Sequence, residues 1–319
     1  MLRPAPVLTA VLTAAAMSTA VPLAGTASAS PAPAPSAATV PLVFSSDRDG
    51  DSELYRVDSR GRSTQLTRNT SNDSNPVWSP DGTRIAFVSD RDGDDELYVM
   101  RADGSRVRQL THNRRTPDGG PAVDQYPAWS PGGTRLAFAS NRTGGETEIW
   151  VVQADGSRPT RLTRTARHVM DHTPSWSPDG RLIAFASNRL AYDDVDLYLM
   201  RPDGTGVRRL TSAPGDENAP DWSPDGRRIA FSSNRQHQQD VYVMDADGRG
   251  TRKVTGRSDL DEVFPRWTAR GDRLVFSTFR SPTGRAGDLH VVDLDGSGRR
   301  LLTWSRADDT SPDPHPRSS

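Results

Sequence analysis

A block built around tryptophan recurs five times along this chain, and this repeat limits the possible folds more than any other feature. Each copy has a proline, a tryptophan two residues later, a Ser-Pro-Asp-Gly turn or a variant of it, and a short apolar run. The tryptophans are Trp78, Trp129, Trp176, Trp222 and Trp267, spaced 45 to 51 residues apart. Self-similarity at this period is typical of propellers and solenoids.

The apolar runs inside one repeat have the length and composition of β-strands. Residues 84–88 (RIAFV) and 97–100 (LYVM) are rich in strand-forming side chains, and turn residues bound them on both sides. No apolar period of 3.6 residues occurs, which excludes a helical solenoid. We therefore expect four strands in each repeat, named a to d in chain order, with strand a ending at the tryptophan.

Asp-Gly pairs mark the hairpins between these strands. Asp81 and Gly82 follow strand a, and Asp103 and Gly104 follow strand c. We expect type I′ turns at both places, because Asp-Gly is a strong signal for this turn, whose two central residues need positive φ.

The two ends of the repeat region complement each other. Residues 41–67 contain strands b, c and d without a strand a, and residues 309–314 follow the pattern that leads to Trp222, with Pro314 in the place of tryptophan. We predict an all-β fold, a six-bladed β-propeller of four-stranded blades over residues 40–316, with the first blade closed by a C-terminal strand. Pro314 and Pro316 should weaken that strand, because proline donates no backbone hydrogen bond.

The first 39 residues have the composition of an export signal and a linker. Residues 1–29 combine Arg3, an uncharged apolar stretch and the small residues 27–29, which is the pattern of a signal peptide. Pro22 interrupts the stretch after about fifteen residues, short of the roughly 20 that span a bilayer. Residues 30–39 are rich in proline and alanine and should form an extended linker. We expect a secreted protein without a stable membrane anchor, periplasmic if the host has an outer membrane.

Charge and cysteine content exclude several classes of partner and scaffold. The 40 basic and 41 acidic side chains nearly cancel, so neither a nucleic acid nor a membrane surface is indicated as partner. The chain has no cysteine, which excludes a disulfide scaffold and a lipidated N-terminal cysteine. We expect a monomer stabilised by core packing, whose electrostatics have to be examined locally.

The recurring strings WSPDG, SNR, LYVMRADG and RxLT resemble the PD40 (WD40-like) repeats of the TolB β-propeller family. The resemblance covers nearly all of the chain after the linker. It implies the propeller fold, and it leaves function open: TolB is a periplasmic, non-enzymatic protein that binds the peptidoglycan-associated lipoprotein, whereas the same repeat occurs in peptidases and a pectin-fragment lyase. Only the signal and linker precede residue 40, so the α/β domain of TolB and a contact with TolA are not expected.

One carboxylate stands three residues before the strand-a proline in every repeat. The six residues, here called the acidic ring, are Asp73, Asp124, Asp171, Glu217, Glu262 and Asp309. They fall on connectors from the outermost strand d to the innermost strand a, so we expect them at one mouth of the central channel. Oxygen ligands suit a hard cation, so the ring is a candidate site for Ca²⁺ or for a basic segment of a partner protein.

An arginine two residues after the end of strand b offers each ring carboxylate a partner within the protein. These arginines are Arg48, Arg91, Arg142, Arg189 and Arg235, with Arg280 one residue out of register. The b–c loops and d–a connectors leave the blades on the same face. The alternative to ligand binding is therefore that each carboxylate pairs with an arginine or caps its own turn.

Other candidate sites are less specific. The acidic loops 47–53 (DRDGDSE) and 90–96 (DRDGDDE) have glycine at the fourth position, not at the sixth as in an EF-hand loop, so solvated turns are expected rather than metal sites. His168 and His172 bracket Asp171, but the six histidines are scattered over different elements. The repeat tryptophans should pack between blades rather than stack sugars.

These features favour a non-catalytic exported propeller that holds a protein partner, from the envelope or outside the cell, at the channel mouth. The long connector 112–126 is the expected contact. The main alternative is a propeller enzyme, a polysaccharide lyase or hydrolase with a metal ion at the same mouth; a third is a propeller that works only with separately encoded subunits. No GxSxG motif or cysteine nucleophile occurs, and the acidic ring is nearly symmetric, unlike an acid–base pair.

Overall fold

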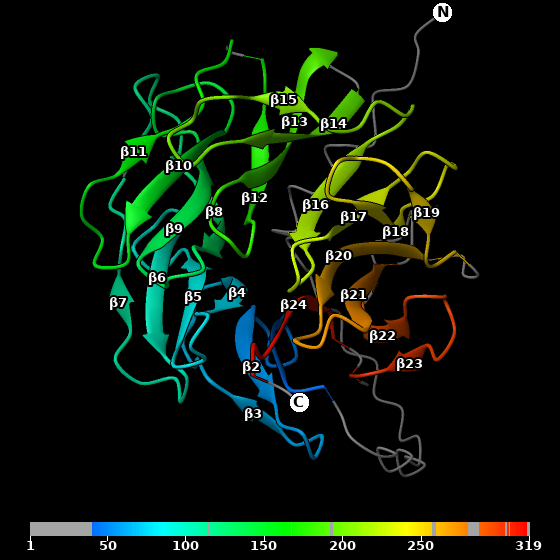
Figure 1. The fold of residues 1–319 in the computed structure, drawn as a ribbon. Helices are drawn as coiled ribbons and strands as arrows, with labels where there is room; N and C mark the ends of the chain where they lie inside the picture. Colours follow the sequence, from blue (N-terminus) through cyan, green and yellow to red (C-terminus); the bar gives the residue numbers. More distant parts are fainter. Residues whose placement is uncertain are drawn as a thin grey trace, which may run out of the picture. The chain divides into compact units, whose positions relative to one another are not determined.

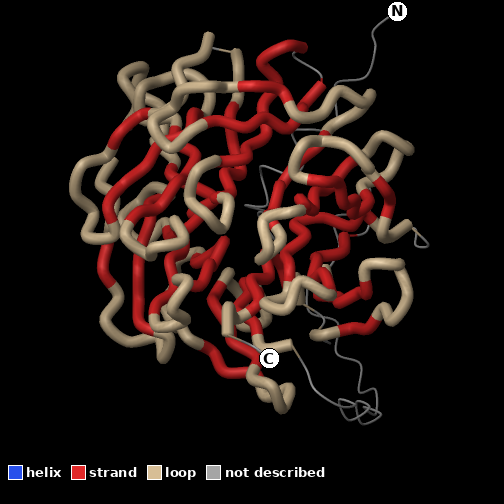
Figure 2. The backbone as a smooth tube through the Cα atoms, viewed as in Figure 1, coloured by secondary structure: helices blue, strands red, loops and turns tan. Residues whose placement is uncertain are grey.

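The computed structural model describes residues 40–113, 115–166, 168–191, 194–256, 260–279, 287–303, 305 and 307–317. Six four-stranded antiparallel sheets follow one another around a centre, and no described residue is helical (Figures 1 and 2). The predicted six-bladed β-propeller is thereby confirmed. The signal and linker predicted for residues 1–39, and Arg280, lie outside the described residues.

Each sheet is one blade, in which strand a is innermost and strand d outermost. Blade 1 comprises β24 (Asp309–Pro314), β1 (Leu42–Ser46), β2 (Glu53–Val57) and β3 (Ser63–Gln65). Blade 2 comprises β4 (Asp73–Trp78), β5 (Arg84–Ser89), β6 (Glu96–Arg101) and β7 (Arg108–Gln109). Blade 3 comprises β8 (Asp124–Trp129), β9 (Arg135–Ser140), β10 (Glu148–Gln153) and β11 (Thr160–Arg161).

The second half of the chain repeats this order. Blade 4 comprises β12 (Asp171–Trp176), β13 (Ile183–Ala191), β14 (Asp194–Met200) and β15 (Arg208–Arg209). Blade 5 comprises β16 (Glu217–Trp222), β17 (Arg228–Ser233), β18 (Asp240–Asp245) and β19 (Arg252–Lys253). Blade 6 comprises β20 (Asp261–Trp267), β21 (Arg273–Phe279), β22 (Leu289–Asp293) and β23 (Arg300–Leu301).

The C-terminal strand closes blade 1, as the repeat pattern predicts. β24 pairs antiparallel with β1, with Leu42 opposite Pro314 and Ser46 opposite Asp309. His315 N donates to Pro41 O at 2.8 Å, one residue beyond the strand. Figure 1 accordingly shows the red β24 beside the blue strands of the first blade. Pro314 ends the pairing but does not prevent closure.

The hydrophobic core lies between neighbouring blades. In each blade one phenylalanine of strand b is fully buried; the six are Phe44, Phe87, Phe138, Phe185, Phe231 and Phe276. The repeat tryptophans are only 6–8% exposed. Trp129 of blade 3 lies in one apolar cluster with Val77 and Leu97 of blade 2, and its Nε1 donates to Val77 O at 3.3 Å. The tryptophans thus join blades, which confirms the packing prediction.

The type I′ prediction for the Asp-Gly hairpins is wrong. Gly82 and Gly104 have φ of 68° and 84°, but neither Asp81 nor Asp103 has positive φ. In the first turn, Pro80 fixes its own φ in the negative region. The Asp81 carboxylate then accepts hydrogen bonds from Ser79 Oγ and Thr83 N, so only glycine needs the left-handed conformation.

Strand a is longer than predicted because it contains a bulge in every blade. The residue before each proline has φ between 48° and 55°; the six are Asn75, Tyr126, Thr173, Ala219, Phe264 and Ser311. The register between strands a and b shifts at this place, for example between Ser74 and Val77. The left-handed conformation costs a residue other than glycine about 1–2 kcal/mol. The acidic ring therefore lies within strand a, before the bulge, and not in the connector.

A chain that ends after residue 307 lacks β24 and exposes the edge of β1. We expect its thermal midpoint to lie about 6–12 °C below that of a chain ending at Arg317, because losing about 3 kcal/mol shifts the midpoint of a domain this size by roughly that much. Thermal melts and size-exclusion chromatography measure the change, and the open edge should also cause association. Equal midpoints would show that β24 does not close the ring.

Candidate functional site

The acidic ring is assembled, but its carboxylates are shielded from solvent. All six side chains are 0% exposed. Five of them pair with the arginines named from the sequence, at N–O distances of 2.5–2.9 Å; the pairs are Asp309–Arg48, Asp73–Arg91, Asp124–Arg142, Asp171–Arg189 and Glu217–Arg235. Glu262 pairs with Arg299, which directly precedes β23. Pairing of each carboxylate with an arginine is the alternative to ligand binding that the sequence predicted. Cation binding by the ring stays a prediction.

Each of the five arginines that follow strand b is fixed by three kinds of contact, as blade 2 illustrates. Arg91 Nε donates to Ser89 Oγ at 2.8 Å, and Nη2 donates to both carboxylate oxygens of Asp73 at 2.9 and 3.0 Å. The guanidinium also covers the rings of Phe87 and Tyr98, 5.5 and 4.7 Å from their centroids. A charged hydrogen bond and a cation–π contact reinforce each other here. The buried charge is therefore neutralised within the blade.

A second row of carboxylates, at the start of strand c, was missed in the sequence analysis. Its members are Glu53, Glu96, Glu148, Asp196, Asp240 and Asp288, of which the first five are at most 4% exposed. The same tryptophan alignment would have shown an acidic residue before each apolar run of strand c.

Asparagines connect the second row of one blade to the acidic ring of the next. Asn69 Nδ2 donates to Asp73 Oδ2 of blade 2 at 2.9 Å and to Glu53 Oε2 of blade 1 at 3.3 Å. Asn113 links Glu96 to Asp124 in the same way, at 3.4 and 2.7 Å. The d–a connectors thus hold adjacent blades together through polar contacts.

The blades differ in how they neutralise the second row. In blades 3, 4 and 5 a cation on strand d pairs with the carboxylate; the pairs are Arg161–Glu148, Arg209–Asp196 and Lys253–Asp240. In blades 1 and 2 the same strand-d position holds Gln65 and Gln109. The register shows the equivalence: Gln65 lies opposite Tyr55 and Gln109 opposite Tyr98, at the position where Arg161 lies opposite Trp150 in blade 3. Among the described residues, Glu53 and Glu96 form no salt bridge.

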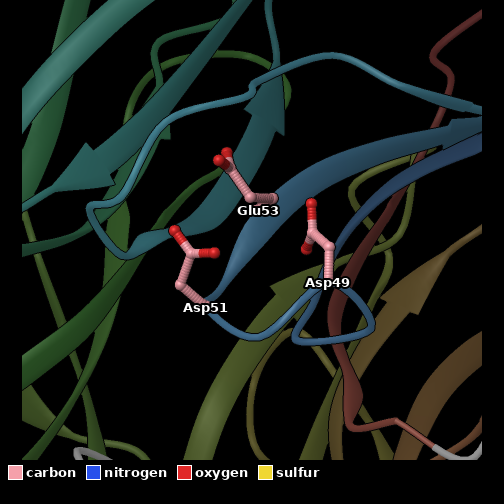
Figure 3. Close-up of side chains that lie close together, drawn as sticks. All are labelled: Asp49, Asp51 and Glu53. Atoms are coloured by element: carbon pink, nitrogen blue, oxygen red, sulfur yellow. The ribbon is translucent and has the colours of Figure 1, made fainter.

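Blades 1 and 2 carry extra aspartates in the acidic b–c loops instead. Asp49, Asp51 and Glu53 lie close together, with one oxygen of each within 4.8 Å of the others (Figure 3). Asp92, Asp94 and Glu96 repeat this grouping in blade 2. The expected solvated turns are therefore only partly solvated, because the two glutamates are 0% exposed.

Burial changes the acidity of the two glutamates. Desolvation, with the nearby Asp73 and Asp51 charges, raises the pKa of Glu53 to about 7. Desolvation and the Asp124 charge raise the pKa of Glu96 to about 8. Both carboxyl groups are protonated over part of the neutral pH range unless a cation approaches them.

The central channel is blocked by aromatic side chains. Residues of strand a from all six blades line a cavity of about 20 Å³, enough for about one water molecule. Tyr126 of blade 3 and Phe264 of the opposite blade 6 stack across it, with ring centroids 6.5 Å apart. A partner segment therefore cannot thread through the channel while these rings remain stacked.

Three charged residues in the channel connect the closing strand β24 to the blades beside it. Arg266 of blade 6 lies 3.4 Å from Asp221 of blade 5 and 3.8 Å from Asp313 of β24. Asp313 also accepts from the backbone N of Trp78 in blade 2, at 2.7 Å. Burial raises the pKa of Asp313 to about 7. The group holds the closing strand to its neighbours.

The histidines do not join the acidic ring in a metal site. His168 is exposed, whereas His172 faces the channel, 6.4 Å from the Tyr126 ring, where burial lowers its pKa to about 4. Asp171, between them in sequence, is bound to Arg189. Within the described part of the chain, the groups able to share a metal ion contain only carboxylates.

Charge is distributed unevenly between the two faces of the propeller. The connector face comprises the described residues of the b–c loops and d–a connectors with their flanking strand residues, within the segments 46–53, 67–73, 89–96, 111–124, 140–148, 163–171, 187–196, 211–217, 233–240, 255–262, 277–288 and 303–309. By sequence these segments carry 27 acidic and 14 basic residues, a net charge of −13, whereas the rest of residues 40–317 carry 14 acidic and 25 basic residues, net +11. Three strand-d cations, Arg161, Arg209 and Lys253, and Arg299 just before β23 reach carboxylates of these segments, whose net charge with these four cations is −9.

Two segments extend this face beyond the regular blade. The long connector before β8 folds back on itself, with Thr116 N donating to Gly120 O at 3.0 Å. The b–c hairpin of blade 4 pairs as far as Ala191 opposite Asp194, whereas blade 2 pairs only to Ser89 and Glu96. Leu190 in that hairpin is 65% exposed, the highest value for a large apolar side chain among the described residues.

Comparison with known proteins agrees with this architecture. The model of the TolB β-propeller domain matches residues 7–124 and 111–195, and that of the tricorn protease N-terminal β-propeller domain matches residues 190–318. A protein named TolB homolog from Chlorobium luteolum is 31% identical over 270 residues, 71% of this chain and 59% of that protein. The chain thus spans only about three fifths of that relative.

Solved structures share the fold at lower identity. TolB from Acinetobacter baumannii has a TM-score of 0.73 and 20% identity, over 88% of this chain and 67% of that one. A putative TolB from Agrobacterium tumefaciens has a TM-score of 0.70 and 21% identity, over 88% of this chain and 96% of that one.

Breaking one ring pair should destabilise the propeller. We expect Asp171→Asn to lower the free energy of unfolding by about 2–3 kcal/mol, because Arg189 then keeps a partly buried charge without its carboxylate. Denaturant titration of Asp171→Asn, Arg189→Gln and the double variant measures the coupling. Arg181→Gln, on the exposed turn, is the control and should change stability by less than about 0.5 kcal/mol. Full additivity would show that the pair contributes nothing.

The second row predicts a loss of stability at mildly alkaline pH. Glu53 and Glu96 keep protons in the folded state that the unfolded state has already lost, so their stabilising effect is present at low pH and disappears as pH rises through about 7 and 8. The opposite effect of the buried His172 ends near the ordinary histidine pKa of about 6.5. Thermal melts in chelator should therefore show midpoints that fall from pH 6.5 to 8.5, and less so in Glu96→Gln. An unchanged slope in Glu96→Gln would contradict this origin.

Proposed function

Since the chain belongs to the TolB β-propeller family, we propose that it is an exported, non-catalytic binding protein whose connector face holds a basic segment of a protein partner. The charge distribution carries the proposal. A face with net charge −9, on a chain with net charge −1, attracts a basic partner and orients it, because long-range electrostatics guide association.

The form of the face supports binding over catalysis. Each ring carboxylate is 0% exposed and paired with arginine, whereas a catalytic acid or base has to lie within hydrogen-bond reach of its substrate. The exposed Leu190 on the projecting hairpin offers an apolar contact beside the charges. Closure of the channel by Tyr126 and Phe264 favours docking across the mouth rather than threading.

The export part of the proposal rests on the signal pattern of residues 1–29. No helix among the described residues is long and apolar enough to cross a membrane. We therefore propose that the protein binds its partner outside the cytoplasm, as a secreted protein, or in the periplasm where an outer membrane is present.

Affinity capture with variants on each face tests the proposal. The full chain, tagged, is used to capture proteins from the envelope and culture fluid of the producing cell, beside Glu146→Lys with Leu190→Glu on the connector face and Val207→Glu on the opposite face. We expect the connector-face variant to capture at least tenfold less of the partner than the wild type. The Val207→Glu control changes another exposed apolar side chain and should capture as much as the wild type. Capture should also fall as salt rises from 0.05 to 0.5 M. Loss in the Val207→Glu variant alone would place the binding face on the other side.

A further inference from the structure

We propose that the b–c loop of blade 1 is a Ca²⁺ site formed by the carboxylates of Asp49, Asp51 and Glu53. The site is distinct from the acidic ring and lies at the outer side of the connector face, where strand c begins. It goes beyond the proposed function, since partner binding does not require it.

The spacing of the three carboxylates fits one calcium ion. One oxygen of each residue lies within 4.8 Å of the others (Figure 3). Ca²⁺ binds oxygen at about 2.3–2.6 Å, so two ligands on opposite sides of one ion can be up to about 5.2 Å apart. Mg²⁺, at about 2.0–2.1 Å, demands a tighter and more regular arrangement. Asp49 is exposed, which leaves coordination positions open to water.

Other blades of the propeller place a cation at the corresponding position. The second-row carboxylate contacts the Arg209 guanidinium in blade 4 and the Lys253 ammonium in blade 5, both at 2.6 Å. In blade 1 that strand-d position holds the neutral Gln65, and the loop supplies two aspartates in addition to Glu53. Blade 1 thus lacks the strand-d cation of blades 3 to 5 and gathers three acidic side chains instead, which is the composition expected where an external cation takes that place.

An oxygen of the cluster also lacks the partner that burial requires. Asp51 Oδ2 is buried and has no hydrogen-bond donor. Glu53 is 0% exposed and accepts hydrogen bonds from Asn69, but it makes no salt bridge with a described residue, although every ring carboxylate has one. Burying a carboxylate without a compensating cation is costly. A bound Ca²⁺ supplies that compensation.

Calcium titration of the full chain, stripped with chelator, tests the site. The wild type should bind Ca²⁺ in calorimetry, and 10 mM CaCl₂ should raise its thermal midpoint by about 3–10 °C, as expected for Kd of about 10⁻⁴–10⁻³ M. Asp51→Asn and Gln65→Arg should each bind one Ca²⁺ fewer than the wild type. Gln65→Arg fills the site with the guanidinium that blade 3 has, so its midpoint in chelator should equal or exceed that of the wild type, which shows that it folds.

Matched variants separate this site from other acidic groups. Glu146→Gln removes the acidic residue at the position of Asp51 in blade 3, where Arg161 is present, and should leave the Ca²⁺ stoichiometry unchanged. Asp171→Asn, in the acidic ring, should also leave it unchanged. Absence of Ca²⁺ binding by the wild type, or a stoichiometry that Gln65→Arg leaves unaltered, would overturn the proposal.

Discussion

The structure depends on the neutralisation of buried carboxylates by arginines of the same blade. Each blade buries an acidic residue on its innermost strand, and an ionised carboxylate is costly there without a partner. The arginine that supplies the partner also covers the aromatic pair of strands b and c. One side chain thereby connects the polar mouth of the blade to its apolar interior, which explains why serine, arginine and acidic residue recur together in the sequence.

The features that differ between blades indicate where a function can lie, because the carboxylate–arginine pair is common to all of them. Every blade buries its ring carboxylate and pairs it with an arginine, so the ring distinguishes no blade as a reaction site. The second row is not alike: strand d supplies a cation in blades 3 to 5, and glutamine stands there in blades 1 and 2. The channel is also uneven, with Tyr126 and Phe264 meeting across it and Arg266 bound near the closing strand. Binding sites are expected where repeated units differ, because loops vary on a shared scaffold.

The tryptophan spacing predicted the blade count, the four strands and the closure by β24, because each of these follows from the repeat alone. It also identified the ring residues and five of their arginines. The bulge at Asn75 and its equivalents was not predicted, since residues other than glycine rarely adopt positive φ and the fold imposes it. The type I′ turn was predicted wrongly because Gly82 N and Gly104 N donate to Ser79 O and Arg101 O, which places each glycine at the fourth turn position and not at the centre. The Arg299 partner of Glu262 and the stacking of Tyr126 on Phe264 join residues far apart in sequence, which no local pattern contains.

The central claim is that the protein neutralises its acidic ring with its own arginines and leaves an acidic loop of blade 1 to an external cation. Crystals of the chain grown in CaCl₂, measured at a wavelength where calcium scatters anomalously, test this claim most directly. The account predicts an anomalous peak between Asp49, Asp51 and Glu53, and none among the ring carboxylates. A peak inside the acidic ring, with Arg91 or its equivalents turned away, or an empty blade 1 loop at saturating calcium, would contradict it.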